Sequence, residues 1–335
     1  MQLIRRQAHA RAGLVGNPSD GYNGRTVSIS VQNFRAEVVL YEWHTLEIVF
    51  SEEDKTRFRS LKELSTDVVL HGYYGGVRLV KATIKTFSDY CERLAIPLHD
   101  RNFSIRYESN IPRNVGLAGS SAIIVATLRA LLDFYQVTIP LEVQPSLALS
   151  VENNELKIPG GLQDRVIQVY EGCVSMDFSK EHMTEQQGYL CGVYERLDPA
   201  LLPPLYVAYA AEFGEPTEVV HNDLRGRFNR GDPNIITAMQ KFADLAAAGR
   251  DAIVDRDYPR LARLMDENFD TRRSICQLHQ GHVAMIEAAR SVGASAKFAG
   301  SGGAIVGTYR DEQMLEDLKT ALGGLNCVVL KPQIV

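Results

Sequence analysis

The segment between residues 103 and 135 constrains this 335-residue chain more than any other. It begins with an alternating run, residues 103–107, which predicts a strand, and it ends with the apolar run 122–135, which predicts a helix. Between the two, residues 112–121 are rich in glycine and other small side chains. Glycine lets a backbone turn its N–H groups toward an anion, and a following helix adds the positive end of its dipole. The order of strand, loop and helix therefore predicts a site that accommodates a triphosphate.

Two serines at the start of the predicted helix, Ser120 and Ser121, leave two interpretations open. Their hydroxyls can cap the helix after a flexible loop, or they can bind a phosphate and its Mg²⁺. The loop is not a Walker loop, because no Gly-Lys-Ser/Thr follows it, and no Gly-x-Gly-x-x-Gly nicotinamide fingerprint opens the helix.

Two carboxylates, Glu152 and Asp164, stand on either side of a turn that contains Pro159-Gly160-Gly161. Phosphoryl transfer uses a cation that bridges the nucleotide oxygens and a carboxylate near the attacking hydroxyl, so two acids have separate uses. Each acid can equally be solvated or ion-paired, and Arg165 is an available partner.

Two further glycine-containing segments lie near the ends of the chain. Residues 300–303 read Gly-Ser-Gly-Gly and follow Lys297; so many glycines cost backbone entropy, and a tight turn is the alternative explanation. Near the start, Arg11, Asn17 and Asp20 surround a glycine turn. Such side chains can hydrogen-bond sugar hydroxyls, although ordinary surface-turn chemistry explains them equally well.

Charge and composition exclude several classes of protein. The chain carries 36 basic and 41 acidic residues, a formal net charge of −5, so it has no basic face for nucleic acid. Its five cysteines form no Cys-x-x-Cys pair for zinc or redox chemistry and indicate buried thiols in a reducing compartment. We find no signal peptide and no apolar run of about 18 residues, and expect a cytoplasmic protein that does not enter membranes.

The remaining pattern predicts an α+β fold. Alternating runs at residues 26–31 and 36–40 favour strands, and strands and helices mix without regular βαβ alternation. The pattern loosens between residues 189 and 204, which suggests two lobes, residues 1–195 and 196–335. The sequence leaves open whether the protein is a monomer or a homodimer.

Taken in order, these segments resemble the three signature motifs of the GHMP kinases, the superfamily of galactokinase, homoserine kinase and mevalonate kinase. Residues 11–20 resemble the first motif, residues 112–122 the second and residues 297–304 the third. Within the superfamily the chain is most similar to the glucuronokinases, familiar from plants, over residues 13–20, 72–79, 161–166, 176–183 and 297–304. The resemblance implies two lobes, an N-terminal ribosomal-protein-like α/β lobe and a C-terminal ferredoxin-like lobe, with ATP in the cleft between them.

The resemblance also implies ATP and Mg²⁺ as cofactors and a role for each matching position. Asp164 takes the place of the catalytic aspartate, and Arg11 helps to acidify the attacking hydroxyl. Ser121 and Glu152 are the implied Mg²⁺ ligands. The implied sugar-binding residues are Arg11, Asn17, Asp20, Asp164 and Gly302. The implied ATP and phosphate contacts are Pro112, Gly116, Leu117, Ala118, Gly119, Ser120, Ser121 and Ala122, with Ser301, Gly302 and Gly303 closing over them.

The implied reaction is phosphorylation of D-glucuronic acid at C1, which gives glucuronic acid 1-phosphate and ADP. Galactokinases carry Glu-His where this chain has Asn17-Pro18, which argues against galactose. The second motif has one extra residue near Ala118, so its phosphate contacts differ in detail. Arabinose, galacturonate, galactose or a heptose phosphate remain alternative acceptors, and a non-catalytic sugar sensor is the alternative from another class. A uronic acid needs a matching cation, for which Arg78, Arg225 and Arg227 are candidates.

Overall fold

The structure is a computed structural model that describes residues 3–49, 60, 75–210 and 218–334, with side chains from residue 224 onward in the last range. Residues 72–74 of one glucuronokinase-like stretch lie outside the described residues. Within the described ranges, no helix combines the length and the apolar character needed to cross a membrane. All five cysteines are free thiols: Cys91, Cys173 and Cys191 are buried, and Cys276 and Cys327 are half-buried.

The larger sheet is built around one long strand. The long strand is β2, the sheet has the strand order β3-β4-β2-β5-β8, and β1 also pairs with β2. The strands are β1 (Leu3–Val15), β2 (Arg25–Trp43), β3 (Glu47–Ile48), β4 (Asn102–Ser109), β5 (Cys173–Asp177) and β8 (Val193–Leu197). The two strand-like runs at residues 26–31 and 36–40 are parts of this single strand β2. The alternation is interrupted between them because the register with β1 shifts there, which leaves residues 32–34 as a bulge.

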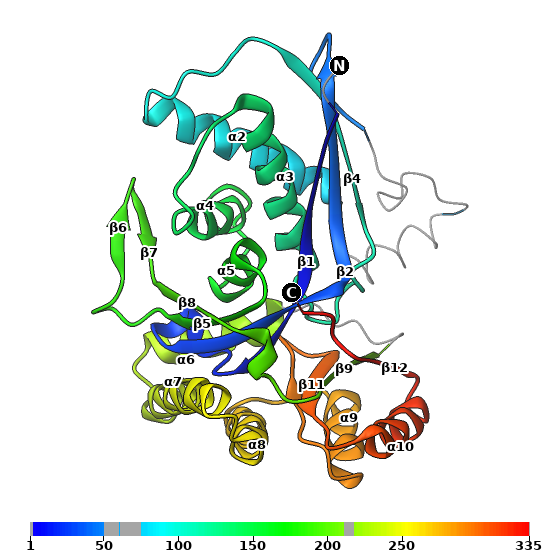
Figure 1. The fold of residues 1–335 in the computed structure, drawn as a ribbon. Coiled ribbons are helices and arrows are strands. Elements are labelled where there is room, and N and C mark those ends of the chain that lie inside the picture. The colour runs from blue at the N-terminus through cyan, green and yellow to red at the C-terminus, as the bar shows by residue number, and fades with distance from the viewer. Residues whose placement is uncertain (1–2, 50–59, 61–74, 211–217, 335) are drawn as a thin grey trace.

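Helices cover one face of this sheet (Figure 1). They are α2 (Gly76–Arg93), α3 (Gly119–Tyr135), α4 (Gln144–Ser150), a π-helical turn (Val151–Glu155) and α5 (Gln163–Tyr170). Helix α3 is buried along most of its length, and it packs against β1 and β2. Its apolar surface is therefore what fixes the loop before it, residues 112–118, at the end of the sheet.

A second sheet, in the order β10-β11-β9-β12, follows in the chain. Its strands are β9 (Leu205–Ala210), β10 (Lys297–Phe298), β11 (Ala304–Thr308) and β12 (Cys327–Leu330), with a separate hairpin of β6 (Thr184–Gln186) and β7 (Tyr189–Cys191). The later helices are α6 (Glu218–Asn229), α7 (Pro233–Val254), α8 (Tyr258–Ile275), α9 (Gln280–Ser291) and α10 (Glu312–Gly323). Aspartate side chains cap the N-termini of α7, α8 and α10, as expected for this residue.

The predicted α+β class is confirmed, since strands and helices mix without regular βαβ alternation and the strand pairs are mostly antiparallel, with β3–β4 as a parallel exception. The predicted lobe bounds, residues 1–195 and 196–335, stay a prediction. Strand β8 belongs to the first sheet as far as Leu197, and the second sheet begins with β9 at Leu205. A short 3₁₀ turn, Pro199–Leu201, lies between them.

Candidate active site

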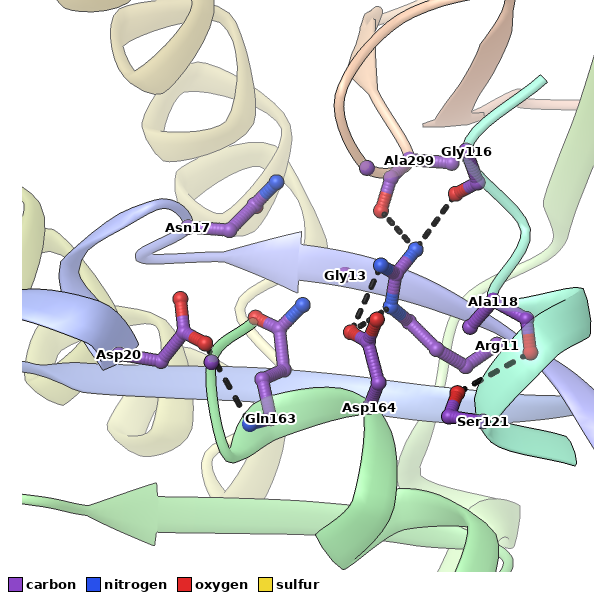
Figure 2. A network of polar contacts seen from close by, with 12 residues as sticks. Arg11, Gly13, Asn17, Asp20, Gly116, Ala118, Ser121, Gln163, Asp164 and Ala299 are labelled. Atoms are coloured by element: carbon purple, nitrogen blue, oxygen red, sulfur yellow. Dashed lines mark hydrogen bonds and ion pairs between the residues drawn. The ribbon is translucent and has the colours of Figure 1, made fainter. Parts of the chain in front are cut away.

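Three segments that are far apart in the sequence meet around the side chain of Arg11, in β1. Its Nη1 donates hydrogen bonds to the carbonyl oxygens of Gly116 (2.7 Å) and Ala299 (3.0 Å), as Figure 2 shows. Backbone bonds reinforce the meeting: Arg11 N–H donates to Leu117 O, and Gly13 N–H donates to Ala299 O. Arg11 is only 5% exposed, so the first, second and third motifs share one buried guanidinium. The sequence predicted a glycine turn around Arg11, whereas the residue lies inside a strand.

Arg11 also holds Asp164, in the first turn of α5. Its Nε and Nη2 each lie 2.7 Å from Oδ1 of the carboxylate (Figure 2). The other carboxylate oxygen, Oδ2, lies 3.5 Å from Nη1 of Arg165. The Asp164 side chain keeps about a fifth of its surface exposed, so a ligand can still reach it. Arg11 therefore fixes the orientation of the Asp164 carboxylate, and the carboxylate remains accessible.

The glycine-rich loop before α3 touches the late glycine cluster. Gly116 has a φ of +73°, and a Cβ at this position would lie 2.9 Å from the backbone nitrogen of Ser301. Gly303 has a φ of +79°, and its Cβ would lie 2.9 Å from the Cα of Val115. Both glycines are therefore required for the two loops to approach each other.

Helix α3 begins at Gly119, after Ala118 in a left-handed conformation with a φ of +64°. No side chain in the described part of the chain caps this end, so the serines are not N-caps. Instead, Ser121 Oγ donates to Ala118 O at 3.2 Å, and Gln168 Nε2 donates to the same oxygen at 2.8 Å. The N–H groups of the first turn and the helix dipole thus remain available to an anion.

The other residues of the predicted phosphate loop divide by burial. Leu117 and Ala122 are buried in the core, at 1% and 0% exposure, so they shape the loop through packing. Ser120 is exposed and Pro112 is half-buried. Of these four residues, Ser120 and Pro112 are the ones whose side chains can meet a ligand directly.

Glu152, in the π-helical turn, forms an ion pair with Arg165, and both side chains are 5% exposed. Arg165 Nη1 additionally donates to Gly161 O at 2.7 Å. Of the residues described, no group of three or more His, Cys, Asp or Glu side chains is arranged to hold a metal ion. One carboxylate and the hydroxyl of Ser121 are oxygen donors of the kind Mg²⁺ takes when phosphates and water complete its shell. The residues present therefore fit Mg²⁺ in their chemistry, with Arg165 as a competing partner of Glu152.

Lys297 ties the third motif to the first. Its buried Nζ donates to Gly13 O (2.6 Å), Asn17 Oδ1 (2.6 Å) and Phe298 O (2.7 Å). Burial and the neighbouring cations Arg272 and Arg11 lower the pKa of Lys297 well below its usual value. The predicted sugar contact Asn17 thus has its side-chain oxygen engaged by the protein and only its amide nitrogen to offer.

Arg272, on α8, is a residue of this site that the sequence did not indicate. Its Nη1 donates to Gly300 O at 2.6 Å and its Nη2 donates to Ser301 O at 2.9 Å. Its side chain is buried, which lowers the pKa of the guanidinium. An arginine near the C-terminus of an amphipathic helix carries no sequence signal that separates it from a surface charge.

Asp20, in the 3₁₀ turn Ser19–Tyr22, lies close to Asp164. Burial, and next the charge of Asp164, raise the pKa of Asp20 to about 6. The backbone N–H of Gln163 donates to its Oδ2 at 3.4 Å (Figure 2). A Cβ on Gly161 would collide with the same oxygen, so the turn with two glycines makes room for Asp20.

Comparison with known proteins defines the class of this fold: an enzyme that transfers a phosphoryl group to an alcohol. Residues 78–172 match the family described as "GHMP kinases N terminal domain". Among solved structures, galactokinase of Lactococcus lactis in complex with galactose is similar with a TM-score of 0.80, 14% identity and coverage of 99% of this chain and 94% of that one. Mevalonate kinase of Methanococcus jannaschii is similar with a TM-score of 0.72, 16% identity and coverage of 100% and 99%.

More similar in sequence is Glucuronokinase 1 of Arabidopsis thaliana, which is 47% identical over 310 residues, 90% of this chain and 84% of the relative. Probable glucuronokinase 2 of the same plant is 47% identical over 312 residues. This chain belongs to the GHMP kinase family, together with the glucuronokinases. The resemblance stated from the motifs is thereby confirmed, and with it an ATP-dependent kinase activity.

Proposed function

We propose that the protein phosphorylates D-glucuronic acid at C1, using ATP and Mg²⁺, to give glucuronic acid 1-phosphate and ADP. The observation that carries the proposal is the accessible carboxylate of Asp164, held by Arg11 beside the glycine-rich loop. The 47% identity to Glucuronokinase 1 supports glucuronate as the acceptor.

In the proposed mechanism, Asp164 orients the C1 hydroxyl through Oδ2 and receives its proton as the hydroxyl oxygen attacks the γ-phosphorus in line. Arg11 acts as a positioning residue, because its own donors are directed to Asp164, Gly116 and Ala299. It holds the carboxylate in one orientation.

The phosphates are held, in this proposal, by the backbone N–H groups of residues 116–122 and the N-terminus of α3, with residues 301–303 closing over them. Ser121 and Glu152 would hold Mg²⁺, which supplies charge neutralisation of the phosphate oxygens when bound. Asn17, Asp20 and Gly302 would contact the sugar.

The test is an ADP-release assay on the purified protein with glucuronate, galacturonate, galactose, arabinose and a heptose phosphate. We expect glucuronate to give the highest kcat/KM, EDTA to abolish turnover, and ³¹P NMR to show an anomeric phosphate. A higher kcat/KM on another sugar would refute the acceptor assignment, and no ADP release above the background hydrolysis on any sugar would favour the non-catalytic sensor.

A further inference from the structure

We propose that Arg225, on α6, binds the carboxylate of the acceptor sugar and so determines the preference for a uronic acid. The inference rests on the proposed function. It adds a specificity-determining residue that lies outside the three motifs.

Arg225 lies against the same turn that carries Asp20. Its guanidinium carbon is 4.4 Å from the ring centroid of Tyr22, which is a cation–π distance. A Cβ on Gly21 would lie 2.9 Å from Arg225 Nη2, so the glycine is what lets the guanidinium approach the turn. In the turn Ser19–Tyr22, Asp20 therefore lies beside Asp164, and the next two residues contact the guanidinium of Arg225.

A rigid apolar base holds this arginine in place. Tyr22 packs edge-on against Phe228, with ring centroids 4.9 Å apart, in a cluster that includes Leu224 and Phe242. Leu224 precedes Arg225 directly and is 1% exposed. Because its neighbours on the helix are anchored and its own face rests on Tyr22, the Arg225 side chain loses little further freedom when it binds an anion.

The guanidinium of Arg225 is available, in contrast to that of Arg227. Arg227 Nε lies 3.0 Å from Asp232 Oδ2, and its Nη1 donates to Ile275 O at 2.9 Å, so it is committed to the fold. Arg225 is exposed, and in the described part of the chain no carboxylate lies within ion-pair distance of it. The third candidate, Arg78, is carried by α2, which packs against α3 and the π-helical turn instead of the Asp20 turn.

The chemistry of the acceptor matches this order of residues. In glucuronate, C1 and C5 flank the ring oxygen, so the reacting hydroxyl and the carboxylate lie along the same edge of the sugar. A site that orients the hydroxyl at Asp164 therefore needs a cation near it for the carboxylate, and Arg225 supplies one beside the turn that carries Asp20. A planar guanidinium pairs with a carboxylate through two parallel, charge-assisted hydrogen bonds.

The experiment compares Arg225→Gln and Arg225→Lys with the wild type, and uses Arg230→Gln as a matched control, since Arg230 is an exposed arginine at the end of the same segment. The readouts are KM for glucuronate, KM for ATP, and the inhibition constant of glucuronamide, a neutral analogue that lacks the charge. We expect Arg225→Gln to raise KM for glucuronate about 10- to 100-fold, with KM for ATP and the glucuronamide constant unchanged. Arg225→Lys should be intermediate, because it keeps the charge and loses the fork. The control should match the wild type throughout.

Two outcomes would overturn the inference while leaving the proposed function intact. One is an unchanged KM for glucuronate in Arg225→Gln. The other is an equal loss for glucuronate and glucuronamide in both Arg225 variants, which would indicate a structural role. Failure of the proposed function is seen separately, in the wild type, as a lack of turnover on glucuronate, and the inference would fall with it.

Discussion

Arg11 and Asp164 are joined through a single carboxylate oxygen: Nε and Nη2 of the arginine both lie 2.7 Å from Oδ1. The other oxygen, Oδ2, has Arg165 Nη1 at 3.5 Å. Oδ1 thus fixes the orientation of the side chain, and Oδ2 is the oxygen that we propose to meet the substrate hydroxyl. Orientation of this kind is a large part of what phosphoryl-transfer enzymes provide.

The first prediction concerns Asp164→Asn. The amide keeps the shape of the side chain and cannot take a proton, so we expect kcat to fall by about 100- to 10,000-fold. The dissociation constant for ATP, measured by calorimetry, should stay within about twofold, because no phosphate contact is assigned to this residue. Asp244→Asn, at an exposed position of α7, is the control and should retain full activity. Wild-type turnover in Asp164→Asn would remove its assigned role.

The second prediction uses the raised pKa of Asp20, about 6 in the folded protein against 3.8 as the ordinary value. Between these pH values the folded state binds more protons than the unfolded state, so this group lowers stability as pH rises from about 4 to about 6. Asp20→Asn removes the buried charge. We therefore expect the variant to melt at a higher temperature than the wild type at pH 7.5, with the difference reduced to about half at pH 5.

Differential scanning fluorimetry at the two pH values measures this gap. Asp251→Asn, at an exposed site, is the control variant. A gap of the same size at both pH values, or a larger one at pH 5, would contradict the assignment of the shifted carboxyl to Asp20.

The third prediction concerns Lys297→Met. Methionine fills the space and donates no hydrogen bonds, which leaves three buried oxygens without this donor. We expect the free energy of unfolding to fall by about 2–3 kcal/mol in urea titrations. Because Asn17 loses its anchor, KM for the sugar should rise more than KM for ATP.

Lys241→Met removes an exposed lysine on α7 and should change stability by less than about 0.5 kcal/mol. If Lys297→Met were as stable as this control, the three hydrogen bonds of Lys297 Nζ would contribute nothing measurable to stability. A rise confined to KM for ATP would place Lys297 with the phosphate loop instead.

The fourth prediction concerns Gly116→Ala. The left-handed backbone disfavours a Cβ by roughly 1–2 kcal/mol, and the methyl group would press on Ser301 and Gly302. We expect KM for ATP to rise about tenfold or more, by about the same free energy, with a smaller effect on the sugar. Gly323→Ala, at a position with open space around it in α10, is the matched change and should leave both constants unaltered.

Much of the site could be predicted from local sequence. Residues 112–121 combine glycines with a following apolar helix, and that pattern specifies a loop at a helix N-terminus wherever it occurs. The motif at residues 300–303 was recognisable for the same reason, because glycines with positive φ are needed for close backbone approach. The turn that contains Pro159-Gly160-Gly161 was expected between Glu152 and Asp164, but the helix α5 that follows it, with Asp164 in its first turn, was not.

The partners of the charged residues could not be predicted. Lys297 bonds to Asn17 across 280 positions in the sequence, and Arg272 bonds to the loop at Gly300 from a separate helix. Which acid pairs with Arg165 was open as well, and the structure gives it the buried Glu152, with Asp164 at 3.5 Å. Which residues pair depends on how whole helices and strands pack, and the local sequence pattern carries no information on that packing. Likewise, Ser120 and Ser121 resembled caps, yet the left-handed Ala118 moves the helix start to Gly119.

The bond from Lys297 to both Gly13 and Asn17 has a consequence for the thermodynamics of recognition. The segment proposed to surround the sugar is ordered by the side chain of Lys297, so the conformational entropy of arranging this segment is lost when the chain folds. Binding of a small molecule then requires little rearrangement. Natural substitutions at Lys297 should therefore lower heat resistance and sugar affinity together.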